Sequence, residues 1–381
     1  MKRDLIFTVN PGATSTKCAL FETSTSGVTP YLDVTIEHLD ADLARFNSIP
    51  EQLGYRYQLV QEFLQMGLAD NDRIVACAGR GGMLTPVPSG AIKVNPELVE
   101  FSLYAPVYQH ASNLGAPLAY KVGCQYGVEA YIVDPVCVDE FDPVARISGS
   151  PDFHRFSFVH ALNTRATARK LAQQQGKTFE QMNFVVAHLG GGFSISCIKQ
   201  GRIVDNDNRM EGGAFTPERS GGVPPIPLID ACFSGQYTQQ ELKKKLYGEG
   251  GLYAYLGTRD LRDVEQMIDT GDTRAKLVYD AMVYQILKSM AAMASVVQFD
   301  VDAFILTGGL AFSKRLISDL APALEKIAPV SLFPGSNENE SLAETTFDLL
   351  QGRMTPMGWP INDANGCSAN TTLIEKTEEL A

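Results

Sequence analysis

The chain contains 381 residues and has a mass of 41.5 kDa, enough for two or three domains at about 150 residues each. Hydrophobic residues make up 45% and charged residues 20%, which excludes a chain that is disordered throughout. The 32 Lys and Arg residues against 44 Asp and Glu give a net charge of −12, which disfavours nucleic-acid binding. No window approaches about 18 uninterrupted apolar residues, so we expect no membrane association. The seven scattered Cys lack a C-x-x-C pair, which disfavours a disulfide framework or a metal cluster, so we expect the protein to reside in the reducing cytoplasm.

Short apolar segments predict strands through the first half of the chain, and longer segments with a period near 3.6 predict helices between them. The first strand stops at the turn Asn10-Pro11-Gly12, and a second strand follows at once. Strands are predicted at residues 5–9, 17–21, 31–36, 73–78 and 130–133, and helices at 51–66 and 111–127.

The opening pattern recurs in the second half of the chain. Residues 183–190 can be laid over residues 5–12 at an offset of 178 (183 − 5), which places His188 on Asn10 and Gly190 on Gly12. In both copies an apolar strand enters a glycine turn and a second strand follows. The repeat indicates two domains of like topology, although hairpins with glycine turns are common enough for a chance match.

The rest of the second half continues the alternation of helices and strands. Residues 273–298 predict a long helix whose Met-rich stripe is typical of core packing, and a strand at 304–306 ends in Thr307-Gly308-Gly309. The basic run at 243–245 is interpreted as a solvated helix face. Residues 352–381 contain several Pro and Gly and then a helical tip. The alternation predicts an α/β fold.

Four glycine-rich turns follow apolar strands, and such turns let backbone N–H groups approach a phosphate. The first is not a Walker A loop, because Lys17 follows Gly12 without a second Gly and a strand rather than a helix comes next. One turn alone could belong to an ordinary hairpin, but several together favour phosphate or nucleotide binding. The turns are Asn10 to Lys17, Gly79 to Gly82, Gly190 to Gly192 and Thr307 to Gly309.

Charged and polar side chains accompany these turns. Arg80 and Arg219 lie in glycine loops, where a guanidinium can bind carboxylate or phosphate oxygens in pairs. His188 stands before three glycines, where it could donate to charge that develops on a transferred phosphoryl group. Each residue taken singly could also be structural. Similar positions are held by His110, His160 and Asp134; Asp134 is a candidate metal-linked carboxylate or simply a turn residue before Pro135.

With these motifs in order, the sequence resembles the acetate kinase group of carboxylate kinases and, within it, the butyrate kinases. The resemblance covers residues about 4–350 and is far more specific than any single turn. It rests on segments 9–17, 79–82, 110–116, 133–141, 160–163, 187–192, 217–222, 306–311 and 333–335 with Glu340.

The resemblance implies the two-domain fold of actin, sugar kinases and Hsp70. That fold consists of two duplicated ribonuclease H-like domains, each a mixed sheet with flanking helices, with a cleft between them. We expect residues 1–155 plus about 345–381 to form the first domain and 156–344 the nucleotide-binding domain. The implied activity is reversible transfer of the ATP γ-phosphoryl to a short-chain carboxylate, giving an acyl phosphate and ADP. Relatives are typically homodimers.

The resemblance also implies a role for each motif. Arg80, Arg219, His188 and His160 are expected to be catalytic, and Arg80 and His110 to bind the substrate. Asp134 and Glu340 are expected to hold Mg²⁺, with Glu338 as the alternative to Glu340. Phosphates and adenosine of ATP or ADP are expected at Asn10, Ser15, Lys17, Gly190, Gly191, Gly192, Gly308, Gly309 and Ala311.

Three features leave the prediction open. Ala13 stands where many relatives have Ser, the acidic turn at 336–340 is about two residues longer than usual, and the tail after Gly352 has no counterpart. An acetate or propionate kinase is the alternative enzyme, because pocket shape sets the acid's chain length. A non-catalytic nucleotide-binding protein of the actin or Hsp70 type is the alternative of another class. Such a protein should lack the paired Arg80 and Arg219 with His188.

Overall fold

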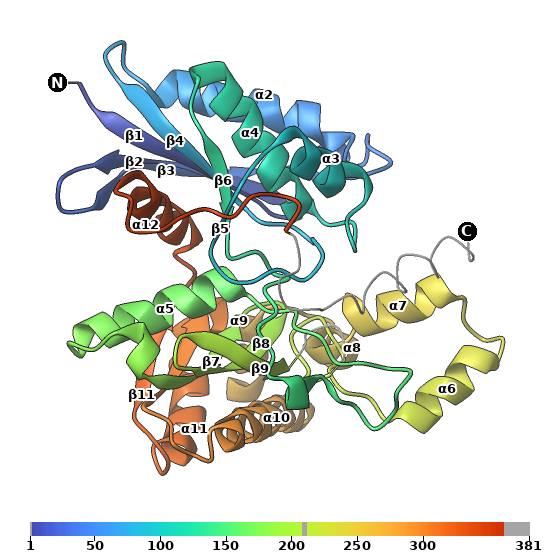
Figure 1. Cartoon of the computed structure of the whole chain (residues 1–381). Helices are drawn as coiled ribbons and strands as arrows, with labels where there is room; N and C mark the ends of the chain where they lie inside the picture. Colours follow the sequence, from blue (N-terminus) through green and yellow to red (C-terminus); the bar gives the residue numbers. More distant parts are fainter. Residues whose placement is uncertain (1, 208–211, 362–381) are drawn as a thin grey trace. The chain divides into compact units, whose positions relative to one another are not determined.

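A computed structural model of the chain describes residues 2–207 and 212–361 (Figure 1). The chain divides into two compact units. The first consists of the described residues up to Cys137 together with those from Glu338 onward, and the second is Val138–Asn337. The domain boundaries expected near residues 155 and 345 stay a prediction. The helical tip expected near the C-terminus lies outside the described residues.

The first unit is built on a six-stranded mixed sheet with the order β3-β2-β1-β4-β6-β5. Neighbours β1–β2, β2–β3 and β5–β6 are antiparallel, whereas β1–β4 and β4–β6 are parallel. Helices α2 and α4 cover one face of the sheet and α12 covers the other (Figure 1). The strands are β1 (Asp4–Pro11), β2 (Ser15–Thr23), β3 (Val28–Glu37), β4 (Arg73–Arg80), β5 (Ala91–Lys93) and β6 (Ala130–Val133). The helices are α1 (Asp40–Leu43), α2 (Gln52–Gly67), α3 (Pro96–Tyr104), α4 (Gly115–Tyr126) and α12 (Glu338–Leu350), with a 3₁₀ turn at Ala111–Leu114.

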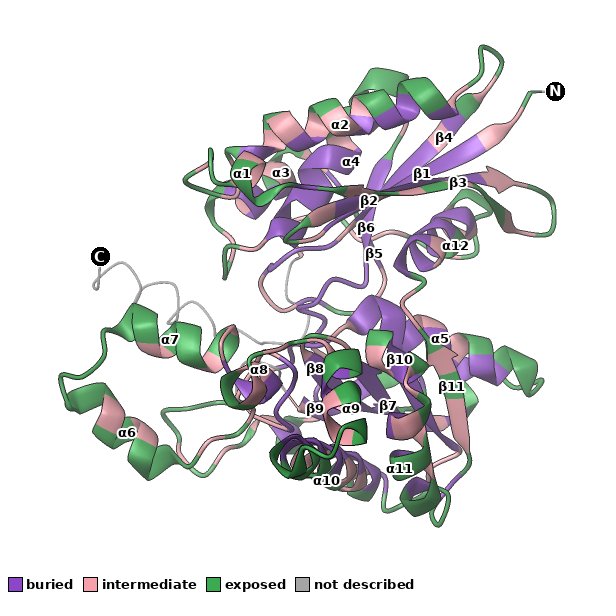
Figure 2. Ribbon diagram, turned by 180° about the vertical axis from the view of Figure 1, so that it is seen from behind, coloured by how far each residue is buried: buried purple, intermediate pink, exposed green. Residues whose placement is uncertain are grey.

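The second unit is built on a five-stranded mixed sheet with the order β11-β10-β7-β8-β9. Helix α5 covers one face and α10 the other. Figure 2 shows the central strands buried between these layers. The strands are β7 (Asn183–Leu189), β8 (Phe193–Lys199), β9 (Arg202–Asp207), β10 (Ala303–Gly308) and β11 (Val330–Pro334). The helices are α5 (Ala161–Gln174), α6 (Pro225–Phe233), α7 (Gln239–Tyr247), α8 (Gly251–Leu256), α9 (Leu261–Asp269), α10 (Thr273–Val296) and α11 (Lys314–Leu324).

The two sheets share one topology, which confirms the predicted duplication and the α/β class. In each, three consecutive strands form an antiparallel meander, and the first of them pairs in parallel with a later strand: β1 with β4, and β7 with β10. The turn after β1 and the turn after β7 are therefore equivalent positions. These are the turns that the offset of 178 residues brings together.

Packing on α10 confirms the interpretation of its Met-rich stripe. Met282, Met290 and Met293 lie in the hydrophobic core of the second unit, where flexible side chains fill the gaps between helix and sheet. Leu277, which the helical period of residues 273–298 also predicted to be in the core, is instead 70% exposed. Among the residues described, no helix combines the length and apolar character needed to cross a membrane.

Candidate active site

The strand register of the first unit gathers three predicted site residues at one end of its sheet. Val9 pairs with Gly79, and Arg80 pairs with Val133. Asn10, Arg80 and Asp134 therefore end or follow adjacent strands at the same edge. This edge holds the carboxyl ends of parallel strands, where ligands commonly bind in α/β folds. Asp134 is 3% exposed and has a positive φ of 37°, and its Oδ1 accepts the Gly90 N–H at 2.7 Å.

A carboxylate from the returning helix α12 joins this group. Arg80 Nη1 donates to Glu338 Oε2 at 3.1 Å and, more weakly, to Asn10 Oδ1 at 3.4 Å. Asn10 Nδ2 donates to the same Glu338 oxygen. Glu340 is two residues further along the helix, where the side chain points away from Glu338. Within the described residues, Glu340 makes no side-chain hydrogen bond or ion pair.

The glycines near Arg80 allow the backbone to come close to two other segments, one at Pro135 and one that begins at His110. A Cβ on Gly81 would lie 2.3 Å from Pro135 Cβ, and one on Gly115 would lie 2.1 Å from the Arg80 carbonyl oxygen. The segment that begins at His110 is thereby packed against the Arg80 loop. His110 caps the 3₁₀ turn, with its Nδ1 accepting the Ser112 N–H at 3.1 Å.

Arg56 stabilises the first glycine turn by hydrogen bonds to its backbone, a role that was not predicted from the sequence. Arg56 is fully buried on α2, and its guanidinium donates to the carbonyl oxygens of Gly12, Ala13 and Ser15. Burial lowers the pKa of Arg56 to about 10. Its place on an amphipathic helix gives it the appearance of a surface cation, and only the fold reveals its contacts. Lys17 pairs with Asn10 across the turn.

In the second unit, a polar row crosses three adjacent strands. His188 on β7 pairs with Ser194 on β8 and with Thr307 on β10, so the three side chains share a face of the sheet. His160 precedes α5, and its ring stacks on the His188 ring with 4.0 Å between centroids. Its Nδ1 lies 2.9 Å from Ser194 Oγ. The structure thus brings His160 and His188 together beside the Gly190–Gly192 turn.

Arg219 lies against that same turn. A Cβ on Gly192 would come within 2.8 Å of Arg219 Cζ, so any larger residue would displace the guanidinium from its position here. Two of its nitrogens, Nε and Nη1, are buried without a hydrogen-bond partner in the described structure. Burial lowers the pKa of Arg219, which Glu218 partly offsets. Buried donors without partners are costly, and an anion bound at the turn would satisfy them.

Thr216 fixes the distance between the Arg219 loop and the glycine turn. Its Oγ1 donates to the Gly191 carbonyl at 2.6 Å and accepts the N–H groups of Glu218 and Arg219. This role was not predicted from the sequence, although Thr216 directly precedes the segment 217–222. A hydroxyl residue three positions before a functional Arg was the available signal.

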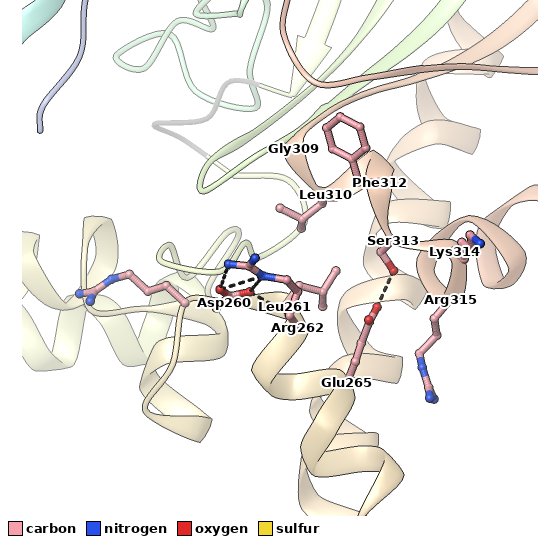
Figure 3. Close-up of a pocket in the computed structure, with 11 residues that line it drawn as sticks. Asp260, Leu261, Arg262, Glu265, Gly309, Leu310, Phe312, Ser313, Lys314 and Arg315 are labelled. Atoms are coloured by element: carbon pink, nitrogen blue, oxygen red, sulfur yellow. Dashed lines mark hydrogen bonds and ion pairs between the residues drawn. The ribbon is translucent and has the colours of Figure 1, made fainter. Parts of the chain in front are cut away.

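A pocket of about 890 Å³ opens beside the last glycine turn (Figure 3). Apolar side chains line it together with four cations and two acids, and such a mixed lining can hold an aromatic base while the polar groups orient it. Gly309 lines the pocket, Ala311 is buried beside it, and Gly308 adopts a φ of 90° where a Cβ would strike Leu189. The lining residues are Arg259, Asp260, Leu261, Arg262, Glu265, Gly309, Leu310, Phe312, Ser313, Lys314 and Arg315.

Comparison with known proteins adds the family context. Residues 153–341 match the sequence model of the Acetokinase family. The chain is 42% identical to a probable butyrate kinase 2 of Caldanaerobacter subterraneus, over 92% of this chain and 98% of that protein. It is 41% identical to butyrate kinase 2 of Clostridium acetobutylicum, over 91% of this chain and 97% of that protein.

Solved structures share the fold at lower identity. Acetate kinase of Porphyromonas gingivalis superimposes with a TM-score of 0.73 at 18% identity, covering 91% of this chain and 100% of that one. A propionate kinase from Francisella tularensis gives 0.67 at 17% identity, covering 90% and 98%. At these identities the likeness supports the fold alone.

Proposed function

The chain belongs to the acetokinase family, and on that premise we propose that it transfers the γ-phosphoryl group of ATP to a short-chain carboxylate, with butyrate or a branched relative as the acceptor. The products are an acyl phosphate and ADP. One observation carries the proposal: the chain is 41–42% identical to two proteins named butyrate kinase over 97–98% of their length.

The side chains present suit this reaction. Phosphoryl transfer develops charge on the equatorial oxygens, so the site needs donors and cations. The acceptor carboxylate is already ionised near neutral pH and needs no general base. In the second unit, Arg219 supplies buried guanidinium donors, His188 donates to the transferred group, and the Gly190–Gly192 backbone binds phosphate. His160 supports the His188 ring from its stacked position.

The first unit supplies the residues for the acceptor and for phosphate. Arg80 binds the carboxylate of the substrate, and His110 lies on the segment packed against the Arg80 loop. Asn10, Ser15 and Lys17 bind phosphate oxygens at the first glycine turn. In the second unit, the pocket lined by Gly309 receives adenosine, with Gly308 and Ala311 shaping its wall.

The acidic residues fit Mg²⁺. Within residues 2–207 and 212–361, no cluster of three or more His, Cys, Asp or Glu could hold a metal by itself. This suits Mg²⁺, which keeps several waters and is held by one or two carboxylates together with substrate phosphates. Asp134 and Glu338 are both buried at the same end of the first unit, and we propose Glu338 rather than Glu340 as the second carboxylate. Bound Mg²⁺ would offset charge on the phosphate oxygens.

Hydroxylamine trapping of acyl phosphate tests the proposal. The purified chain is supplied with ATP, Mg²⁺ and straight or branched acids of two to six carbons. We expect the highest kcat/KM with a four- or five-carbon acid. An optimum at two or three carbons would instead identify an acetate or propionate kinase. Product from none of the acids would favour a nucleotide-binding protein of the actin or Hsp70 type.

We also propose that the enzyme is a cytoplasmic homodimer, as the family resemblance implies.

A further inference from the structure

The side-chain amide of Asn163 contacts His188 on the side of the ring that faces helix α5. Asn163 lies in the first turn of α5 and is 2% exposed, and His188 is 7% exposed. Asn163 Nδ2 lies 2.8 Å from His188 Nδ1 and 3.0 Å from Thr307 Oγ1. Both contacts fall on the polar row that crosses β7 and β10. The amide is therefore fixed by two partners in the interior of the second unit.

The direction of these hydrogen bonds follows from counting protons. Thr307 gives its only hydroxyl proton to the Gly335 carbonyl oxygen at 3.1 Å, so it can only accept from Asn163. The Asn163 nitrogen carries two protons, one for Thr307 Oγ1 and one for His188 Nδ1. With the amide reversed, its oxygen would compete with Gly335 for the single Thr307 proton. His188 Nδ1 is thus an acceptor, and the ring proton lies on Nε2.

We propose that Asn163 is a positioning residue that keeps His188 neutral with its proton on Nε2, ready to donate to a phosphoryl oxygen. Nε2 is on the side of the glycine turn, since a Cβ on Gly190 would lie 3.6 Å from it. A proton on His188 Nδ1 would point at an N–H of the Asn163 amide, and two donors facing each other repel. This contact therefore disfavours both the neutral tautomer with its proton on Nδ1 and the doubly protonated imidazolium. The tautomer of His188 follows from the hydrogen bonds alone and does not depend on the proposed function. The role of Nε2 as a donor to a phosphoryl oxygen does rest on the proposed function.

The neighbouring histidine reinforces this arrangement. His160 is the titratable side chain stacked on His188, and two imidazolium rings 4.0 Å apart would repel each other. The hydroxyl of Ser194 accepts the His160 backbone N–H at 3.2 Å and lies 2.9 Å from His160 Nδ1. This repulsion favours a neutral His188 ring, in agreement with the tautomer that Asn163 selects. A neutral His188 can donate a hydrogen bond through Nε2 without gaining or losing a proton.

Side-chain ¹⁵N NMR of the full chain tests the inference directly. The chain has five His, and the His188 signals are assigned by their loss in His188→Gln. At pH 7.5 without ligands, we expect His188 Nδ1 to be unprotonated and Nε2 protonated. In Asn163→Asp, whose carboxylate accepts rather than donates, we expect a proton on Nδ1. A wild-type ring protonated on Nδ1, or an unchanged Nδ1 signal in Asn163→Asp, would overturn the proposal.

Kinetics provide the second readout. Asn163→Ala should lower kcat by about 10- to 100-fold, as loss of an orienting partner commonly does, with the KM for ATP changed by less than about twofold. Asn183→Ala is the control, because Asn183 lies at the other end of β7 and donates to the Asp300 carbonyl. A full kcat in Asn163→Ala would contradict the positioning role. If the spectra agree but no acid is phosphorylated, the proposed function fails and the tautomer assignment stands.

Discussion

The guanidinium of Arg219 rests on the backbone of Gly192, so closely that a Cβ on Gly192 would lie 2.8 Å from Cζ and 3.0 Å from Nη1. The contact directs a cation with two unpartnered nitrogens toward a turn of backbone N–H groups. A guanidinium and a glycine turn together offer an anion more hydrogen-bond donors than either would alone.

Replacing Arg219 should remove most of the activity without unfolding the chain. Arg219→Ala is expected to lower kcat by roughly 10²–10⁵, the range found for oxyanion donors and arginine fingers. Because two buried donors are lost, the midpoint of thermal unfolding should stay level or rise. Steady-state kinetics and a thermal melt measure the two effects. The control is Arg274→Ala at the exposed start of α10, and a near-normal turnover of Arg219→Ala would remove Arg219 from the catalytic group.

A methyl group at Gly192 should displace the guanidinium while leaving its charge in place. Gly192→Ala is expected to lower kcat by about 10²-fold, because misplacement of a catalytic group by about 1 Å costs that much. Gly149→Ala is the matched control, since nothing lies within 4 Å of a Cβ there. Equal kinetics in the two variants would show that the contact between Gly192 and Arg219 is not needed for catalysis.

The two acidic residues at the start of α12 can be told apart by Mg²⁺ titration of activity. Glu338→Gln should raise the Mg²⁺ concentration needed for half-maximal rate by at least about tenfold, because it removes one of the two buried carboxylates that we propose to hold the ion. It also weakens the contacts to Arg80 and Asn10. Glu340→Gln should behave like the wild type. The reverse pattern would restore Glu340 as the metal-linked residue.

Stability of the first unit should fall in mild acid because of His38. Burial, reinforced by the charge of Arg56, lowers the pKa of His38 to about 4, against 6.5 for an exposed His. Between these values the unfolded chain binds a proton that the folded chain does not, so the free energy of unfolding decreases as the pH falls, by up to about 3 kcal/mol. Urea unfolding from pH 7 to pH 4 measures this slope, and His38→Asn should flatten it. An equal slope in both proteins would assign the effect to other groups.

The repeat at an offset of 178 residues could be predicted from the sequence because strand–turn–strand units have a short-range pattern. His188 was likewise predicted at the end of a buried strand and Arg219 in a glycine loop, and the structure finds both there. Contacts made through distant segments could not be predicted. Arg56 reaches the first glycine turn from a helix about 40 residues away, and Glu338 returns to Arg80 across 258 positions.

Transfer of the γ-phosphoryl group itself is the most direct test of the account. A ³¹P NMR time course of the chain with ATP, Mg²⁺ and butyrate should show the γ-phosphate signal of ATP replaced by an acyl phosphate signal, in equal amount with ADP. The signal should disappear when hydroxylamine is added. Release of inorganic phosphate alone, or ATP that stays intact with every short acid, would contradict the account.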